Sequence, residues 1–273
     1  MREVRSMSDF CEKTIQTWED FLELPHFSED SWIFRGQSED WPLKTSLERA
    51  CERSNIKLKD APSLEKALIT NFRRRYDGHD QQFVLSDTLY CLALMQHHGA
   101  PTRLLDWTYS PYVAFYFALE FSFYSSVVWC VNQTWWSNKV RAIIGDVRYE
   151  QRHRYETRND ASFIPSYMTN KPHKMVGLEN PFFFNQRLNI QQGVFLCSGN
   201  VAVSFEENLK ALDEYYHADA VIKIRCEMNI EDRLRSLKEL HKMNIHRESL
   251  FPGLDGFAQA LSHRLWMYQK IHG

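Results

Sequence analysis

Short apolar runs and helical repeats of apolar residues alternate along the chain without a regular strand–helix order. Four short runs rich in β-branched and aromatic residues predict buried strands. They lie at residues 32–34, 125–131, 193–197 and 220–224. Apolar residues spaced three or four apart predict helices. They lie at residues 8–24, 63–76, 205–212, 231–243 and 257–271. A mixture of elements in this order is typical of an α+β fold.

Two further helices flank a connection at residues 96–111 that is dense in polar groups. The first helix should end at Gly99, where a left-handed residue is expected. The second should begin after Ser110, a good N-cap. It is apolar nearly all round over residues 112–119 and should therefore be buried. Its N-terminus faces the connection and favours an anionic group such as a phosphate.

Residues 133–180 lack a clear apolar period and are mostly polar. A segment of this length without predicted elements is an insertion, a lid or a partner-binding loop. The pattern does not decide among the three.

The composition narrows the class of protein. The chain has 273 residues, and its net charge of −2 gives no global attraction to nucleic acid. Neither GxGxxG nor GxxxxGK[ST] occurs, which argues against a Rossmann or P-loop site. The six cysteines form no CxxC pair and indicate reduced thiols in a cytoplasmic protein. No signal peptide and no apolar run of about 20 residues is visible, so we expect no membrane partner.

Chemically capable side chains gather in and near residues 96–111. His97 and His98 are either metal ligands, although no third ligand at metal spacing is visible, or hydrogen-bonded histidines near a helix end, or one of them is a general base. Arg103 and Asp106 form either an internal ion pair or a site in which the arginine binds substrate and the aspartate performs acid–base chemistry. Arg35, at the end of the first strand, either pairs with Asp106 or binds a phosphate through its planar guanidinium.

Five segments stand out in a fixed order along the chain. They are residues 34–36 (Phe-Arg-Gly), 96–107, 114–118, 192–195 and 250–256. Together they resemble the FRG-domain family, which is named for its Phe-Arg-Gly tripeptide. The resemblance implies a domain at residues 25–260, preceded by a helical extension at 1–24 and followed by a helix end at 261–273. The layout is also similar to the ADP-ribosyltransferase fold, a split mixed or antiparallel sheet with surrounding helices that grips NAD.

The second resemblance implies a role for each motif. An arginine on the first core strand holds the NAD phosphates, and Arg35 fits this position. The second motif shapes the nicotinamide pocket, and Thr102, Trp107 and Thr108 are its candidates. The third motif usually supplies a glutamate that stabilises an oxocarbenium-like centre.

This chain departs from the third motif, because Gln192 stands where an acid is expected. Asp106, Glu227 or Glu248 would have to supply the carboxylate. The resemblance thus implies a set of catalytic residues, namely Arg35, His97, Asp106 and Gln192. It also implies a set of NAD contacts, namely Arg35, Gln37, Thr102, Arg103, Trp107, Thr108 and Ser110.

The first functional hypothesis is an NAD-dependent ADP-ribosyltransferase-like enzyme. It would modify a macromolecule, either nucleic acid (RNA or DNA) or protein, as a bacterial toxin or phage-defence effector, and an antitoxin could neutralise it. The second is a nucleotide-binding module without catalysis, which the missing glutamate favours. The third is a metal-dependent nuclease.

Overall fold

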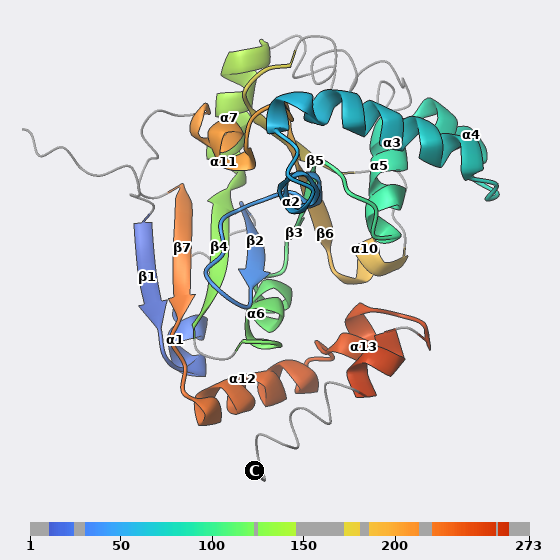
Figure 1. The fold of residues 1–273 in the computed structure, drawn as a ribbon. Helices are drawn as coiled ribbons and strands as arrows, with labels where there is room; N and C mark the ends of the chain where they lie inside the picture. The colour runs from blue at the N-terminus through green and yellow to red at the C-terminus, as the bar shows by residue number, and fades with distance from the viewer. Residues whose placement is uncertain are drawn as a thin grey trace, which may run out of the picture.

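The computed structural model describes residues 11–24, 31–122, 125–145, 172–180, 186–212, 220–254 and 256–261. A seven-stranded mixed sheet forms the centre of the fold (Figure 1). In sheet order the strands are β1 (Cys11–Ile15), β7 (Val221–Cys226), β4 (Ser126–Asn132), β2 (Trp32–Gln37), β3 (Leu104–Thr108), β6 (Gly193–Ser198) and β5 (Val176–Glu179). β1 and β7 are parallel, and the other neighbours are antiparallel.

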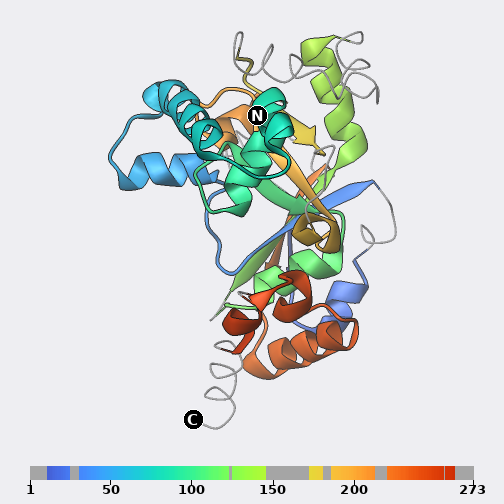
Figure 2. The ribbon, with the colours of Figure 1, turned by 90° about the vertical axis from the view of Figure 1, so that its right-hand side faces the viewer.

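Helices cover both faces of this sheet. In chain order they are α1 (Trp18–Leu22), α2 (Ser46–Arg53), the 3-10 turn η2 (Leu58–Asp60), α3 (Ala61–Arg75), α4 (Gln81–Ser86), α5 (Thr88–His97), α6 (Pro111–Leu119), α7 (Gln133–Ile144), α10 (Gln186–Ile190), α11 (Phe205–Lys210), α12 (Ile230–Lys242) and α13 (Arg247–Leu250). Figure 2 shows α3, α4 and α5 gathered at one end of the molecule and α12 and α13 at the other. The expected α+β fold with surrounding helices is confirmed.

Two hydrophobic cores lie on opposite faces of the sheet. Along β2, Trp32 and Phe34 belong to the core shared with α1, α6 and α12. Ile33 belongs to the core shared with α5 and α7. Because side chains alternate along a strand, Arg35 and Gln37 follow Ile33 onto the second face. The alternation therefore fixes the face on which the polar end of β2 projects.

The helix ends around residues 96–111 are confirmed. The Asp87 carboxylate caps α5, and Gly99 beyond it has a φ of 79°. Ser110 Oγ accepts a hydrogen bond from the N–H of Val113 and caps α6. α6 is buried along most of its length, as its apolar sequence predicted.

The N-terminal segment differs from the helix predicted over residues 8–24. Within the described residues 11–24, Cys11–Ile15 forms an edge strand on β7 and Trp18–Leu22 is helical. The apolar spacing correctly predicted helix α1. The residues before α1 form a strand instead, because β7 offers them backbone hydrogen-bond partners. Residues 11–24 thus add one strand to the sheet before α1, while residues 1–10 lie outside the described residues.

Two other expectations are corrected. The connection at 96–111 contains strand β3, which pairs with both β2 and β6. The segment 133–180, expected to be irregular, contains α7 and β5, while residues 146–171 lie outside the described residues. The predicted terminal helix is described only as far as residue 261. Across the ranges that the structure describes, no helix has the length and apolar character needed to cross a bilayer.

Candidate functional site

A single residue pair joins β2 to β3 at the centre of the sheet. Phe34 pairs with Thr108, and backbone pairing between the two strands ends there. By contrast, β2 pairs with β4 and β3 pairs with β6 along their whole lengths. A pocket of about 610 Å³ is lined by residues from both weakly joined strands. Its volume is typical of a small-molecule site.

The pocket combines aromatic, basic and acidic side chains from five elements and the loop after β2. Its lining residues are Phe34, Arg35, Gly36, Gln37, Ser38, Trp41, Pro42, Lys44, Arg49, Glu52, Asp106, Trp107, Thr108, Phe117, Arg187 and Gln191. Lys44 and Glu52 form an ion pair with each other at 2.9 Å. Three arginines and one aspartate then remain as charged groups of the lining, which leaves the pocket electropositive.

Arg35 is half-buried among these charges. Its Nη1 donates to the backbone oxygen of Asp106 at 2.6 Å, and its Nε is buried without an acceptor. In the described ranges, no carboxylate lies within ion-pairing distance of Arg35. Burial lowers the pKa of Arg35 to about 10, against the opposing attraction of Asp106. A buried cation without a counter-ion is best stabilised by an anion in the pocket.

Close packing requires a glycine at position 36, the last residue of the Phe-Arg-Gly tripeptide. A Cβ at this position would lie 1.8 Å from the backbone oxygen of Ala114 and 2.6 Å from the backbone nitrogen of Ala118. α6 therefore packs directly on the backbone of β2, which only glycine allows here. The tripeptide packs Phe34 and Gly36 against α6 and turns Arg35 to the pocket.

Asp106 presents an oriented carboxylate to the pocket. Its side chain is exposed there, and Gln96 Nε2 donates to its Oδ2 at 3.0 Å. The hydroxyl of Thr102 donates to Gln96 Oε1, which turns the amide nitrogen toward Asp106. Thr102, expected to contact NAD, does not line the pocket and acts on Asp106 through Gln96.

His97 lies beside the main pocket. Together with Asp106 and Arg187 it lines a cavity of about 70 Å³. Partial burial lowers the pKa of His97, and the nearby His98 and Arg187 lower it further. His97 is therefore neutral near pH 7, the form in which a histidine accepts a proton.

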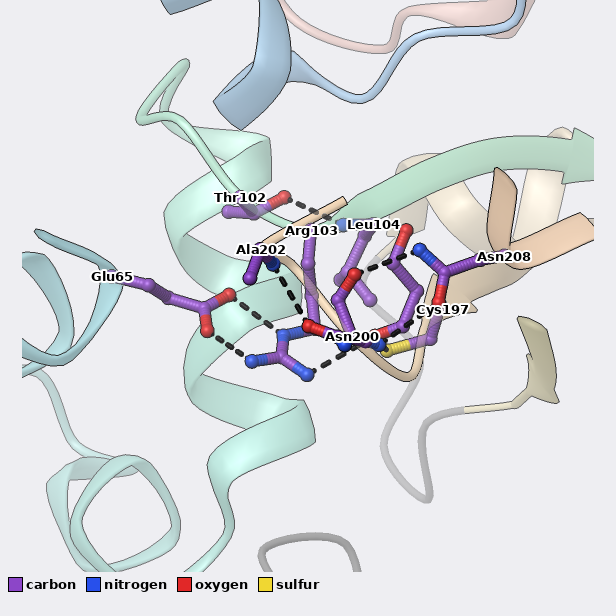
Figure 3. Close-up of polar contacts among 9 residues, drawn as sticks. Glu65, Thr102, Arg103, Leu104, Cys197, Asn200, Ala202 and Asn208 are labelled. Atoms are coloured by element: carbon purple, nitrogen blue, oxygen red, sulfur yellow. Dashed lines mark hydrogen bonds and ion pairs between the residues drawn. The ribbon is translucent and has the colours of Figure 1, made fainter. Parts of the chain in front are cut away.

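Arg103 does not line the pocket, and its guanidinium points toward Glu65, as Figure 3 shows. Its guanidinium forms a bidentate ion pair with Glu65 of α3, with 2.8 Å between Nε and Oε1. Its Nη1 also donates to the backbone oxygen of Ser198 at 3.1 Å. Both side chains of the ion pair are 5% exposed. Arg103 was expected to contact NAD, but this ion pair ties the start of β3 to α3.

Thr108 and Ser110 shape the turn between β3 and α6. The Thr108 hydroxyl donates to the backbone oxygen of Gln191 at 2.7 Å and accepts from the N–H of Ser110. Ser110 uses its own hydroxyl as the cap of α6 and does not line the pocket. Thr108 does line it, with its neighbour Trp107.

The third motif enters the pocket through Gln191 and not through Gln192. Gln192 adopts a φ of 47° and does not line the pocket. The side chain of Gln191 does line it, and its Nε2 donates to the backbone oxygen of Leu250 at 3.0 Å. Glu227 and Glu248, the two alternative acids, also lie outside the lining. Asp106 is thus the carboxylate of the lining that no described cation pairs with.

Residues 30–125 match the family description of the FRG domain. The chain carries an FRG domain. No curated protein and no solved structure matches it. The FRG match includes the tripeptide, the segment 96–107 and α6, whereas the segments 192–195 and 250–256 lie beyond it. The wider domain boundaries, 25–260, remain a prediction.

Outside the matched FRG region, Arg187 of α10 and Gln191, which directly follows α10, complete the pocket. Sequence reasoning did not select Arg187, Trp41 or Arg49 as site residues. Trp41, which is 50% exposed, follows the tripeptide closely and could have been noticed as an unburied aromatic. In the described parts of the chain, no three His, Cys, Asp or Glu side chains gather closely enough to hold a metal ion.

Proposed function

We propose that the pocket binds NAD and that the protein is an ADP-ribosyltransferase-like enzyme. The observation that carries this proposal is the position of Arg35. It is a half-buried cation without an ion-pair partner in the described residues, and it shares one pocket with the oriented carboxylate of Asp106. An arginine suits a phosphate because its planar donors match two phosphate oxygens. The aromatic rings of Trp41 and Phe117 offer apolar surface for a base.

The chemistry requires a group that stabilises positive charge. When the bond between nicotinamide and ribose breaks, its electron pair leaves with the nicotinamide nitrogen, and the ribose carbon becomes oxocarbenium-like. A fixed carboxylate beside that carbon lowers the barrier by electrostatic stabilisation. Asp106 supplies this group in the proposed reaction, and the nucleophile of an acceptor then forms the new bond to the ribose carbon.

The decisive test separates binding from chemistry. We expect Arg35→Ala to weaken NAD binding, measured by calorimetry. We expect Asp106→Asn to retain binding while nicotinamide release falls by about 10²–10³-fold. Arg53→Ala is the control, since Arg53 is exposed on α2 and lies outside the lining. Unchanged nicotinamide release by folded Asp106→Asn would exclude Asp106 from the reaction.

The proposed acceptor is a macromolecule, in keeping with a toxin or phage-defence role in the cytoplasm. Labelled NAD is incubated with the protein and with RNA, DNA or cell lysate. Transfer of label to one fraction identifies the acceptor class. Nicotinamide release without transfer to any fraction would indicate a hydrolase instead.

A nucleotide-binding module without catalysis is the second candidate. The amide of Gln191 favours it, because this residue enters the pocket where the transferase resemblance expects a glutamate. An amide can accept and donate hydrogen bonds but cannot neutralise a developing positive charge. This candidate predicts NAD binding by calorimetry and no nicotinamide release with any acceptor fraction.

A further inference from the structure

Arg187 is a second arginine of the pocket that the proposed reaction does not use. It lies on α10 and lines both the main pocket and the small cavity beside Asp106. Its guanidinium carbon lies 4.4 Å from the centroid of the Phe251 ring. A guanidinium stacked on an aromatic ring keeps its edge, with its N–H donors, available for a ligand.

Arg187 shares the electrostatic condition of Arg35. For the portion of the chain that is described, no carboxylate is within ion-pairing distance of Arg187. Burial lowers its pKa, and the attraction of Asp106 offsets this only in part. The pocket therefore holds two partly desolvated guanidiniums that have no carboxylate partner among the described residues. Such an arrangement costs stability unless an anion is bound.

Phe251 is held firmly behind Arg187. Arg247 also lies over the Phe251 ring, with its guanidinium carbon 4.7 Å from the ring centroid. Arg247 in turn forms an ion pair with Glu120 of α6 at 2.7 Å. The adjacent Leu250 accepts the hydrogen bond from Gln191. Leu250 and Phe251, which begin the segment 250–256 singled out in the sequence, thus support the pocket from behind.

We propose that Arg35 and Arg187 together bind the diphosphate group of the ligand, with Phe251 as a positioning residue for Arg187. This inference rests on the proposed nucleotide site but not on its chemistry. Two planar cations facing one cavity match a ligand with two linked phosphates, each carrying negative charge. A monophosphate or an uncharged nucleoside would leave one of the two guanidiniums without a counter-charge.

Calorimetry on the full chain with inorganic pyrophosphate, ADP and AMP tests the proposal. We expect wild-type protein to bind ADP more tightly than AMP. Arg187→Ala should weaken ADP and pyrophosphate binding by about 10–100-fold, the range for charge-assisted hydrogen bonds, and should abolish the preference for ADP. Arg187→Lys should restore only part of the loss, because an ammonium lacks the planar fork. Asn189→Ala, an exposed change on the same helix, is the control and should bind as wild type.

Phe251→Leu tests the positioning role. It keeps an apolar side chain but removes the ring face, and we expect it to weaken ADP binding less than Arg187→Ala does. If Phe251 acts through Arg187, the double variant should bind ADP as Arg187→Ala alone. Additional loss in the double variant would show that Phe251 acts on the ligand or the fold directly.

Different results would contradict the diphosphate site and the proposed enzymatic function. Arg187-dependent pyrophosphate binding without nicotinamide release from NAD would overturn the enzyme and keep the diphosphate site. Nicotinamide release together with unchanged ADP affinity in folded Arg187→Ala would keep the enzyme and overturn the diphosphate site. Equal loss of AMP and ADP affinity, or no pyrophosphate binding by wild-type protein, would also overturn it.

Discussion

Arg103, directly before β3, and Arg35, in the neighbouring strand β2, have opposite electrostatic environments. Arg103, at the start of β3, is neutralised by the buried carboxylate of Glu65. Arg35, near the end of β2, donates to a peptide oxygen and has no carboxylate partner in the described residues. Both arginines lie in motifs that resemble one family, and both were expected to hold NAD. The partner of a charge, and not its place in a motif, separates an arginine that stabilises the fold from one suited to a ligand.

The different environments of Arg103 and Arg35 also predict opposite effects of the two residues on protein stability. A buried ion pair is costly to break because it leaves a buried charge behind, typically about 3–5 kcal/mol. A desolvated cation without a counter-ion has the opposite effect, because it destabilises the unliganded protein until an anion binds. Stability and ligand affinity should therefore respond differently to changes at the two arginines.

The largest effect should come from Arg103→Ala. We expect a loss of about 3–5 kcal/mol in the free energy of unfolding, because Glu65 would be left buried without its partner. Denaturant unfolding followed by circular dichroism measures this loss. Lys44→Ala is a matched control, since it breaks the more exposed pair with Glu52 and should cost about 1 kcal/mol or less. Equal losses in the two variants would contradict the structural role of Arg103.

Trp41 offers a second, intermediate effect at the mouth of the pocket. Trp41→Ala should weaken nucleotide binding by about 1–3 kcal/mol, the range for stacking of a base on an aromatic ring. Inorganic pyrophosphate has no base, so its affinity should not change. Leu85→Ala, at an exposed apolar residue of α4 outside the lining, serves as the control. Equal losses for nucleotide and pyrophosphate would exclude stacking.

Arg35→Met should produce the smallest change in stability. Methionine fills similar apolar volume without the buried charge, so the free energy of unfolding should rise or fall by no more than about 1 kcal/mol. Ligand binding should nevertheless be lost in the same variant. A loss of stability as large as that of Arg103→Ala would mean that Arg35 is also a structural residue.

The sequence predicted the parts of the fold whose conformation depends on local pattern. The buried strand at 32–34 and the capped helix after Ser110 were both found. β1 and β3 could not be predicted in this way, because each becomes a strand through partners far away in the chain. Cys11 pairs with Ile222, and β3 pairs with β2 and β6. Short apolar runs do not carry this information.

The residues of the candidate site likewise divide into those that a local motif predicts and those that only long-range contacts bring to the pocket. Arg35 and Asp106 could be selected from their motifs because both lie in the pocket-lining strands. The pairing of Arg103 with Glu65 could not, since the two residues come from separate elements. Arg187 was missed because only the tertiary fold brings α10 to the pocket. Long-range partners decide both the strands and the roles of the charges.

The last prediction concerns the pKa of His97, which responds to the positive charge of Arg187. Partial burial, His98 and Arg187 together keep the pKa of His97 below its ordinary 6.5. The folded protein then binds fewer protons at this site than the unfolded chain. The contribution of His97 to stability is therefore present above pH 6.5 and is lost as the pH falls below it.

An NMR titration of the His97 ring should give a pKa below 6.5 in the unliganded protein. Arg187→Ala should raise that pKa because it removes a neighbouring cation, and pyrophosphate should raise it because it adds negative charge. Arg103→Lys, which keeps a charge beside Glu65 and away from the cavity, should leave it unchanged. If neither Arg187→Ala nor pyrophosphate changes the pKa of His97, the cation beside His97 is already neutralised. The contrast between Arg187 and Arg103 would then no longer hold.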